Sequence, residues 1–190
     1  MQKIALEGAH VRLEPLEERH RAQLRPAAQH PEIFTVTTSA LGALYDPYIG
    51  NALKRSDGVH ELAFAVFEKQ LGRFVGMTRY LNIDEANKRL EIGSTWYEPA
   101  VWSGTVNPEC KYLLLRHAFE TLKFNRVEFK TDVRNARSRA AILKLGATQE
   151  GIFRKHMVLA DDHVRDSVYF SIVDGEWPAV KAGLEKRLKA

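Results

Sequence analysis

The sequence predicts a mixed α/β fold in which helices flank a largely antiparallel sheet. Two observations carry this prediction. Residues 60–97 contain three successive strand-like segments, which is the pattern of an antiparallel meander. Residues 87–132 then follow the order strand, helix, strand, and a unit of this kind places its two strands parallel in one sheet.

Length and composition predict one domain over residues 1–190. Of these residues 45% are hydrophobic and 27% are charged, so the chain can bury a core without disulfides. Its one cysteine, Cys110, excludes an intrachain disulfide and fits a reducing compartment. No apolar run is long enough to cross a bilayer. We therefore expect a cytoplasmic protein with no membrane partner.

The charge balance is mildly basic, with 28 Lys and Arg against 24 Asp and Glu and a formal net charge of +4. Nucleic-acid-binding proteins concentrate their cations on one face, whereas here both signs are interspersed along the chain. The densest basic stretch contains Arg134, Arg137, Arg139 and Lys144. It indicates a local anion site, so we expect no nucleic-acid partner.

The first third of the chain predicts one strand and helical segments. Val11 and Leu13 alternate with charged residues, which predicts a strand over residues 9–14. Residues 16–30 are typical of a surface helix that Pro26 disturbs. In the segment 31–58, a further helix face is predicted by residues at helical spacing, Tyr48, Ile49, Ala52 and Leu53.

The central meander and the helix after it give clearer patterns. Residues 60–68 form a continuous apolar run, as in a strand buried on both faces, and residues 73–83 and 87–97 give the next two strands. Residues 107–123 carry apolar side chains at helical spacing. Asn107 is the predicted N-cap, with Pro108 at the first helical position.

The last third alternates strands and helices. Residues 125–132 alternate apolar and polar side chains, which predicts a strand. A helix is predicted from its cap, Asn135, to Leu145, where Gly146 ends it. Two final strands are predicted at residues 148–159 and 164–173, with a turn between them at Asp161-Asp162. A terminal helix is predicted after Asp174.

Two junctions between a strand and a helix are candidates for anion binding. In residues 96–107 a loop with Ser103 and Gly104 leads into a helix, whose free amide groups can bind a phosphate. Asn135 and Ser138 open the second helix. Each junction alone is equally an ordinary connection, and Asn135 can be only a helix cap. Because both follow the parallel strands, both helix N-termini are expected at one edge of the sheet.

The segments around these junctions carry a specific combination of motifs. They are LEIGSTWY (90–97), WSGTVNPECK (102–111), HAFETL (117–122), NRVEFKTD (125–132), NARS (135–138), LKLGATQEG (143–151), RKH (154–156) and RDSVYFSI (165–172). This combination resembles the GNAT superfamily of acetyl-CoA-dependent N-acyltransferases, most closely its RimJ/RimL-type branch. The resemblance implies a GNAT-like α/β fold with a mixed, mostly antiparallel central sheet whose parallel strands splay apart, flanked by helices.

The resemblance also implies acetyl-CoA as cosubstrate, held between the strands at 89–97 and 125–132. The pantetheine arm would lie along the backbone near Trp96, Tyr97 and Glu98, with one amide group there receiving the thioester oxygen. Asn135 matches the family residue that contacts the pantetheine. The basic cluster of Arg137 and its neighbours would contact the adenosine phosphates; the alternative is that it lies on a solvated helix face. The phosphate loop would comprise Trp102, Ser103, Gly104, Thr105, Val106 and Asn107.

The phosphate loop departs from the family pattern at two positions. If Gly104 is its first glycine, Val101 stands where the family has a basic residue or Gln. Val106 then stands where the family has a second small residue. Pyrophosphate binding is therefore expected to depend on the backbone amide groups of residues 102–107.

Acetyl transfer to an amine needs a proton acceptor and a group that protonates the thiolate. Ser138 matches the family residue placed near the sulfur and is the candidate general acid. Glu91 is the candidate general base, acting through water; the alternative is an ion pair with Arg79 or Arg89. His156 is a second candidate base, because its ordinary pKa suits proton transfer.

The acceptor side is predicted from aromatic and charged residues. Tyr80, Arg154 and His156 are the expected substrate-binding residues. Arg154, Arg165 and Asp166 form a polar cluster that binds an acceptor carboxylate or pairs internally. The seven scattered histidines predict no metal site.

Three functions remain open at this point. The first is an acetyltransferase acting on a peptide N-terminus or a small amine. The second is a CoA-binding sensor or scaffold without turnover. The third, a nucleic-acid-binding module, is opposed by the scattered charge. The apolar final strands also make a homodimer an expectation.

Overall fold

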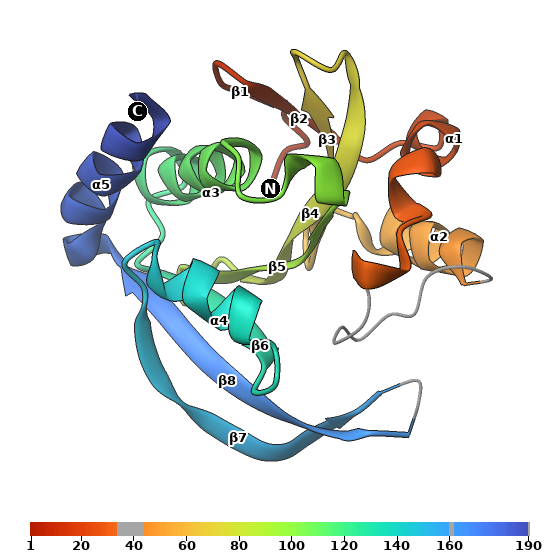
Figure 1. The fold of residues 1–190 in the computed structure, drawn as a ribbon. Coiled ribbons are helices and arrows are strands. Elements are labelled where there is room, and N and C mark those ends of the chain that lie inside the picture. Colours follow the sequence, from red (N-terminus) through yellow and green to blue (C-terminus); the bar gives the residue numbers. More distant parts are fainter. Residues whose placement is uncertain (34–43, 160–161, 190) are drawn as a thin grey trace.

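In the computed structural model, which describes residues 1–33, 44–159 and 162–189, the strands form one mixed sheet (Figure 1). The strand order is β1-β2-β3-β4-β5-β6-β8-β7, and neighbouring strands are antiparallel except β5 and β6, which are parallel. The strands are β1 (Leu6–Glu7), β2 (Val11–Pro15), β3 (Leu62–Glu68), β4 (Arg73–Asp84), β5 (Arg89–Tyr97), β6 (Arg126–Asp132), β7 (Thr148–Val158) and β8 (Val164–Val173).

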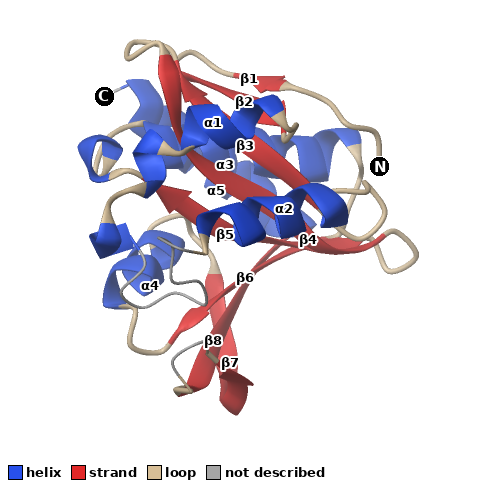
Figure 2. Cartoon of the chain, turned by 90° about the vertical axis from the view of Figure 1, so that its right-hand side faces the viewer, coloured by secondary structure: helices blue, strands red, loops and turns tan. Residues whose placement is uncertain are grey.

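Helices cover both faces of this sheet. Figure 2 shows α1 and α2 on one face, with α3 and α5 behind the sheet on the other. The helices are α1 (Arg19–Leu24), α2 (Tyr45–Arg55), α3 (Val106–Arg116), α4 (Ala136–Leu143) and α5 (Trp177–Lys189). Short helical turns occupy Pro26–Ala28, Pro31–Ile33, Pro99–Val101, His117–Thr121 and Asp174–Glu176.

Two apolar clusters follow from the alternation of side chains along the strands. On the face of α3 and α5, strand residues such as Phe64 and Phe129 pack with Leu114 of α3. On the opposite face, Met77 and Trp96 pack with Ile49 of α2. The second cluster does not extend over β6, β8 and β7, so this face carries polar side chains there.

The predicted α/β fold is confirmed, with differences at element ends. Helix α3 begins at Val106, and its N-cap is Thr105, so the prediction of Asn107 as the cap was wrong. The cause is visible in the backbone, because the amide group of Glu109 already donates to the Thr105 carbonyl at 2.9 Å. Strand β1 was not predicted, since two residues are too short for an alternating pattern. Asp161 of the predicted final turn lies outside the described residues.

The parallel strands separate as the resemblance implied. Strands β5 and β6 pair only over Arg89–Glu91 and Arg126–Glu128. The pairing of β5 with β4 shifts register between Gly93 and Trp96, and Ser94 within this bulge has a positive φ of 45°. A bulge bends its strand, so the last part of β5 leaves the direction of β6. We call the opening between residues 92–97 and 129–132 the wedge.

Candidate active site

The loop before α3 presents unpaired amide groups at the edge of the sheet. In the described part of the chain, the amides of residues 103–107 donate no hydrogen bond to any acceptor. Ser103 has a left-handed φ of 64°, and Pro108, the third residue of α3, has no amide hydrogen to add. Free amides at the positive end of a helix dipole bind phosphate. The loop fits a pyrophosphate held by backbone, without a basic side chain at Val101.

A charged side chain from α4 meets this loop across the open end of the sheet. The Arg137 guanidinium lies 3.7 Å from the centre of the Trp102 indole ring. The indole amine donates to the Tyr97 carbonyl at 2.8 Å, which fixes the ring at the end of β5. Two residues predicted to bind the cofactor are thus brought together from separate segments.

Asn135 caps α4, as the sequence predicted. Its side-chain oxygen accepts a hydrogen bond from the Ser138 amide at 3.0 Å. Ser138 is half-buried in the first turn of α4. Helix α4 follows β6 as α3 follows β5, so both N-termini lie at the carboxyl ends of the parallel strands.

The cap gives a prediction about stability. Replacing Asn135 with Ala removes the only side-chain bond that caps α4 in the described structure. We expect the free energy of unfolding to fall by about 1 kcal/mol. Asn135→Asp keeps the accepting oxygen and should unfold close to the wild-type midpoint in urea. An equal loss in both variants would contradict the capping role.

The end of β5 directs one amide group into the wedge. The Glu98 amide donates to the Val75 carbonyl of β4 at 2.9 Å, so it is not available to a ligand. Adjacent residues of a strand point their amides to opposite edges, so the Tyr97 amide faces away from β4. The Glu98 carboxylate is buried and pairs with Arg73 at 2.5 Å. The side chains of Trp96 and Tyr97 are buried on opposite faces, so only backbone can meet the cofactor here.

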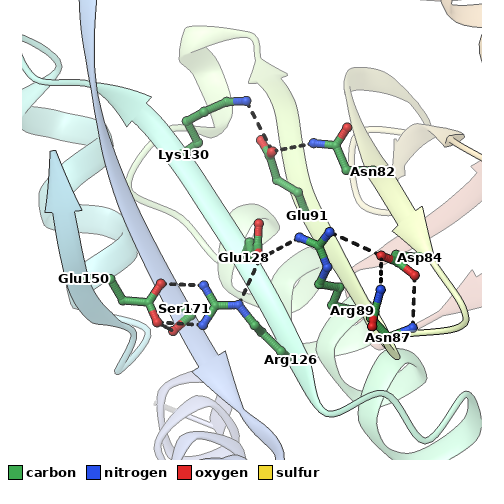
Figure 3. A network of polar contacts seen from close by, with 10 residues as sticks. All are labelled: Asn82, Asp84, Asn87, Arg89, Glu91, Arg126, Glu128, Lys130, Glu150 and Ser171. Carbon is green, nitrogen blue, oxygen red and sulfur yellow. Dashed lines mark hydrogen bonds and ion pairs between the residues drawn. The ribbon is translucent and has the colours of Figure 1, made fainter. Parts of the chain in front are cut away.

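Glu91 lies where the wedge begins and is 2% exposed. Figure 3 shows its carboxylate between Lys130, at 3.3 Å, and the side-chain amide of Asn82, at 3.0 Å. Burial raises the pKa of Glu91 above its ordinary value, while Lys130 opposes that rise. The carboxylate faces the side of the sheet opposite Leu90 and Ile92, which belong to the α3 cluster. A buried carboxyl of this kind suits proton transfer.

The predicted alternative partners of Glu91 were wrong. Arg79 pairs with Glu61 at 3.4 Å and lies over the Tyr48 ring of α2. Arg89 pairs with Asp84 at 3.2 Å. The partner is Lys130, because the parallel register places β6 beside Glu91 and brings this side chain within reach.

Tyr80 was wrongly predicted to bind substrate. It is fully buried in the α3 cluster, and its hydroxyl donates to the Leu114 carbonyl at 2.6 Å. The hydroxyl is therefore a satisfied core group with no access to a ligand. An aromatic residue in an apolar strand gives no sign of which face it occupies.

Arg154 and His156 lie on β7, beside a hollow. This hollow of about 780 Å³ is lined by Phe153, Arg154, Lys155 and His156. The His156 ring is 3.0 Å from the Ser167 hydroxyl on β8, and burial lowers its pKa. Its imidazole is therefore largely neutral at pH 7.

Two buried charged residues of α3 were missed. Glu109 accepts hydrogen bonds from the amides of Ala9, His10 and Val11 at 2.7–2.8 Å. The Lys111 amine is 3.0 Å from the Thr95 hydroxyl beside the wedge, and burial lowers its pKa to about 8. Charged residues inside the apolar pattern of a helix were the available signal.

Within the described residues, no group of three or more His, Cys, Asp or Glu side chains could hold a metal ion. The helices in those same residues include none that is long and apolar enough to span a membrane.

Comparison with known proteins finds an acetyltransferase family model and relatives of the same fold. The family model "Acetyltransferase (GNAT) domain" matches residues 10–148. The relative "Putative ribosomal N-acetyltransferase YdaF" of Bacillus subtilis (strain 168) is 33% identical over 110 residues, which cover 58% of this chain and 59% of the relative, less than two thirds of its length. A solved GCN5-related N-acetyltransferase from Brucella melitensis is 32% identical with a TM-score of 0.91, covering 99% of this chain and 86% of that one. Mycobacterium smegmatis RimJ in complex with CoA-disulfide shares the fold at 19% identity and a TM-score of 0.81, over 97% and 95% of the two chains.

Proposed function

Because the chain belongs to the GNAT acetyltransferase family, we propose that it transfers an acetyl group from acetyl-CoA to a primary amine. The observation that carries this proposal is the wedge, with unpaired amides of residues 103–107 at its edge and Glu91 at its start. It combines a place for a phosphate-bearing thioester with a carboxylate that can take a proton.

In this proposal the protein holds the cosubstrate mainly through its backbone. The amides of residues 103–107 bind the pyrophosphate, and Arg137 adds a positive charge beside it. Asn135 contacts the pantetheine arm at the start of α4. The Tyr97 amide donates to the thioester oxygen as that oxygen gains negative charge, which is the largest single contribution expected in acyl transfer.

Proton transfer is assigned to two side chains. An amine attacks only in its neutral form, so Glu91 takes the ammonium proton through a water molecule. The new carbon–nitrogen bond forms as the carbon–sulfur bond breaks. Ser138 then donates a proton to the departing thiolate and receives in its place the proton that the newly acylated nitrogen loses, which leaves a neutral amide and the CoA thiol. His156 and Arg154, beside the hollow on β7, face the acceptor.

The acceptor in this proposal is the α-amine of a peptide or a small amine. The name of the Bacillus subtilis relative refers to a ribosomal substrate, which favours a peptide N-terminus and the RimJ/RimL-type branch.

The direct test is release of CoA thiol from acetyl-CoA in the presence of a panel of amines and short peptides. We expect turnover with at least one acceptor, and Ser138→Ala should lower kcat by about tenfold, the worth of one hydrogen bond. Calorimetry of each variant with CoA is the control, since Ser138→Ala should bind CoA as the wild type does. CoA binding without any turnover would replace the enzymatic function with a sensor or scaffold.

Further properties of the chain are proposed with this function. All eight strands of the described residues belong to one sheet, which supports the proposal that residues 1–190 act as one domain. The composition fits a cytoplasmic enzyme without a nucleic-acid partner. A homodimer is proposed through the exposed apolar side chains of β7 and of the first residue of β8, which are Ile152, Phe153, Val158 and Val164. Light scattering checks this, because a mass of one 21.6 kDa chain would contradict the dimer.

A further inference from the structure

Among the residues that the structure describes, Arg165 of β8 is a buried cation without an ion-pair partner. The residue is 5% exposed, and its Nε atom is buried with no hydrogen-bond acceptor. No carboxylate of the described chain forms an ion pair with it, and burial lowers its pKa. Removing a guanidinium from water is costly unless an anion and hydrogen bonds compensate it. The structure by itself does not supply that anion.

The two carboxylates that influence Arg165 are already matched by other cations. Asp132 and Glu91 both interact electrostatically with Arg165. Asp132 is 2.8 Å from the Arg134 guanidinium, and Glu91 is 3.3 Å from the Lys130 amine. Within this group of five side chains, three cations face two carboxylates. One positive charge remains, and it lies beside the candidate base.

Arg165 lies close in the strand register to the hollow on β7. In the strand register Arg165 lies opposite Met157, the residue next to His156. His156 lines the hollow of about 780 Å³ together with the exposed cations Arg154 and Lys155. The rim of this hollow attracts anions toward the surplus charge.

We propose that Arg165 binds a carboxylate that the acceptor carries close to its amine. This inference rests on the proposed acetyl transfer, in which Glu91 accepts the proton of that amine. A guanidinium binds a carboxylate through two parallel hydrogen bonds, so it fixes both the position and the direction of the acceptor. Two sources supply this chemistry: the α-carboxylate of a free amino acid, or the acidic side chain of the first residue of a peptide.

Calorimetry of the full chain saturated with CoA tests the inference without requiring turnover. The probes are two matched pairs, the tripeptide amides Asp-Ala-Ala and Asn-Ala-Ala, and alanine with alaninamide. We expect the wild type to bind the carboxylate-bearing member of one pair at least about tenfold more tightly, as a charge-assisted hydrogen bond allows. Arg165→Gln should abolish that preference and leave the neutral member unchanged. The pair that shows the preference identifies the source.

Two further variants keep this test decisive. Arg187→Gln removes a cation from α5, on the far side of the sheet, and should retain the preference. Arg165→Met and Arg165→Gln should unfold at or above the wild-type temperature, because each removes a buried charge without a partner. Equal binding within both pairs, a preference that survives Arg165→Gln, or a lower unfolding temperature would overturn the inference. Thiol release with neutral amines alone would keep the proposed transfer and reject the carboxylate.

Discussion

Replacing Glu91 with Gln should lower kcat by about 10²- to 10⁴-fold, the usual contribution of a general base. The substitution keeps the shape of the side chain in its site between Lys130 and Asn82 but removes the proton-accepting charge. Binding of CoA should be unchanged, since the proposed contacts that hold the cosubstrate lie at residues 97, 103–107, 135 and 137. Steady-state thiol release and calorimetry measure the two quantities.

The pH profile of the wild type separates a base from a merely structural carboxylate. Burial holds the pKa of Glu91 above its ordinary value of 4.5. The base acts when ionised, so activity is present above the raised pKa and is lost as pH falls through it. This acidic limb should disappear in Glu91→Gln.

Glu128 provides the matched control for Glu91. It lies opposite Glu91 in the parallel register and is held by Arg126 at 2.9 Å (Figure 3). Glu128→Gln should keep both kcat and the acidic limb. A loss of kcat as large in this variant as in Glu91→Gln would show that the charge network, and not the base, controls the rate.

Glu109→Gln should lower the free energy of unfolding by about 3 kcal/mol or more. Three backbone amides donate to this one carboxylate, at 2.8, 2.7 and 2.7 Å. An amide side chain offers one oxygen and turns its own donors toward the others, so part of the β1–β2 turn loses its acceptor in a buried place. The unfolding temperature should fall by roughly 6–12 °C in scanning calorimetry.

The control for Glu109 lies in β1, next to the same turn. Glu7 is exposed and pairs with Lys69 at 2.7 Å, so Glu7→Gln should leave the unfolding temperature almost unchanged. Gly8 adds a second check, because a Cβ atom there would lie 2.4 Å from the Glu109 carboxyl carbon. Gly8→Ala should therefore destabilise the chain through the same contact. A wild-type unfolding temperature in Glu109→Gln would contradict this account.

Much of the fold could be predicted from periodicity. The alternation in residues 125–132 and the apolar run in residues 60–68 identify strands because side-chain spacing differs between strand and helix. The cap at Asn135 was predictable because capping is local chemistry within a few residues. The separation of β5 from β6 came only from the family resemblance, since the bulge at Ser94 has no pattern of its own.

The contacts of the candidate site could be predicted much less well. The partner of Glu91 depends on the register between β5 and β6. The same register brings Arg89 to Glu128, although these residues are 39 positions apart in the sequence. Register of this kind is not a local property of the sequence. Tyr80 was placed in the acceptor site because the sequence does not say which face of a strand is covered. Arg165 appeared in the sequence as one member of a polar cluster. Only the structure shows that it is buried and that its Nε atom has no hydrogen-bond partner among the described residues.

The contact of Arg137 with Trp102 has a consequence for the proposed binding of the cosubstrate. Stacking uses the flat face of the guanidinium, while its donors project from the rim in the same plane. Arg137 can therefore donate a hydrogen bond to a phosphate oxygen while it stays in contact with the Trp102 indole. The loop before α3 and helix α4 are thus joined before the proposed cosubstrate arrives, so less conformational entropy is lost on binding.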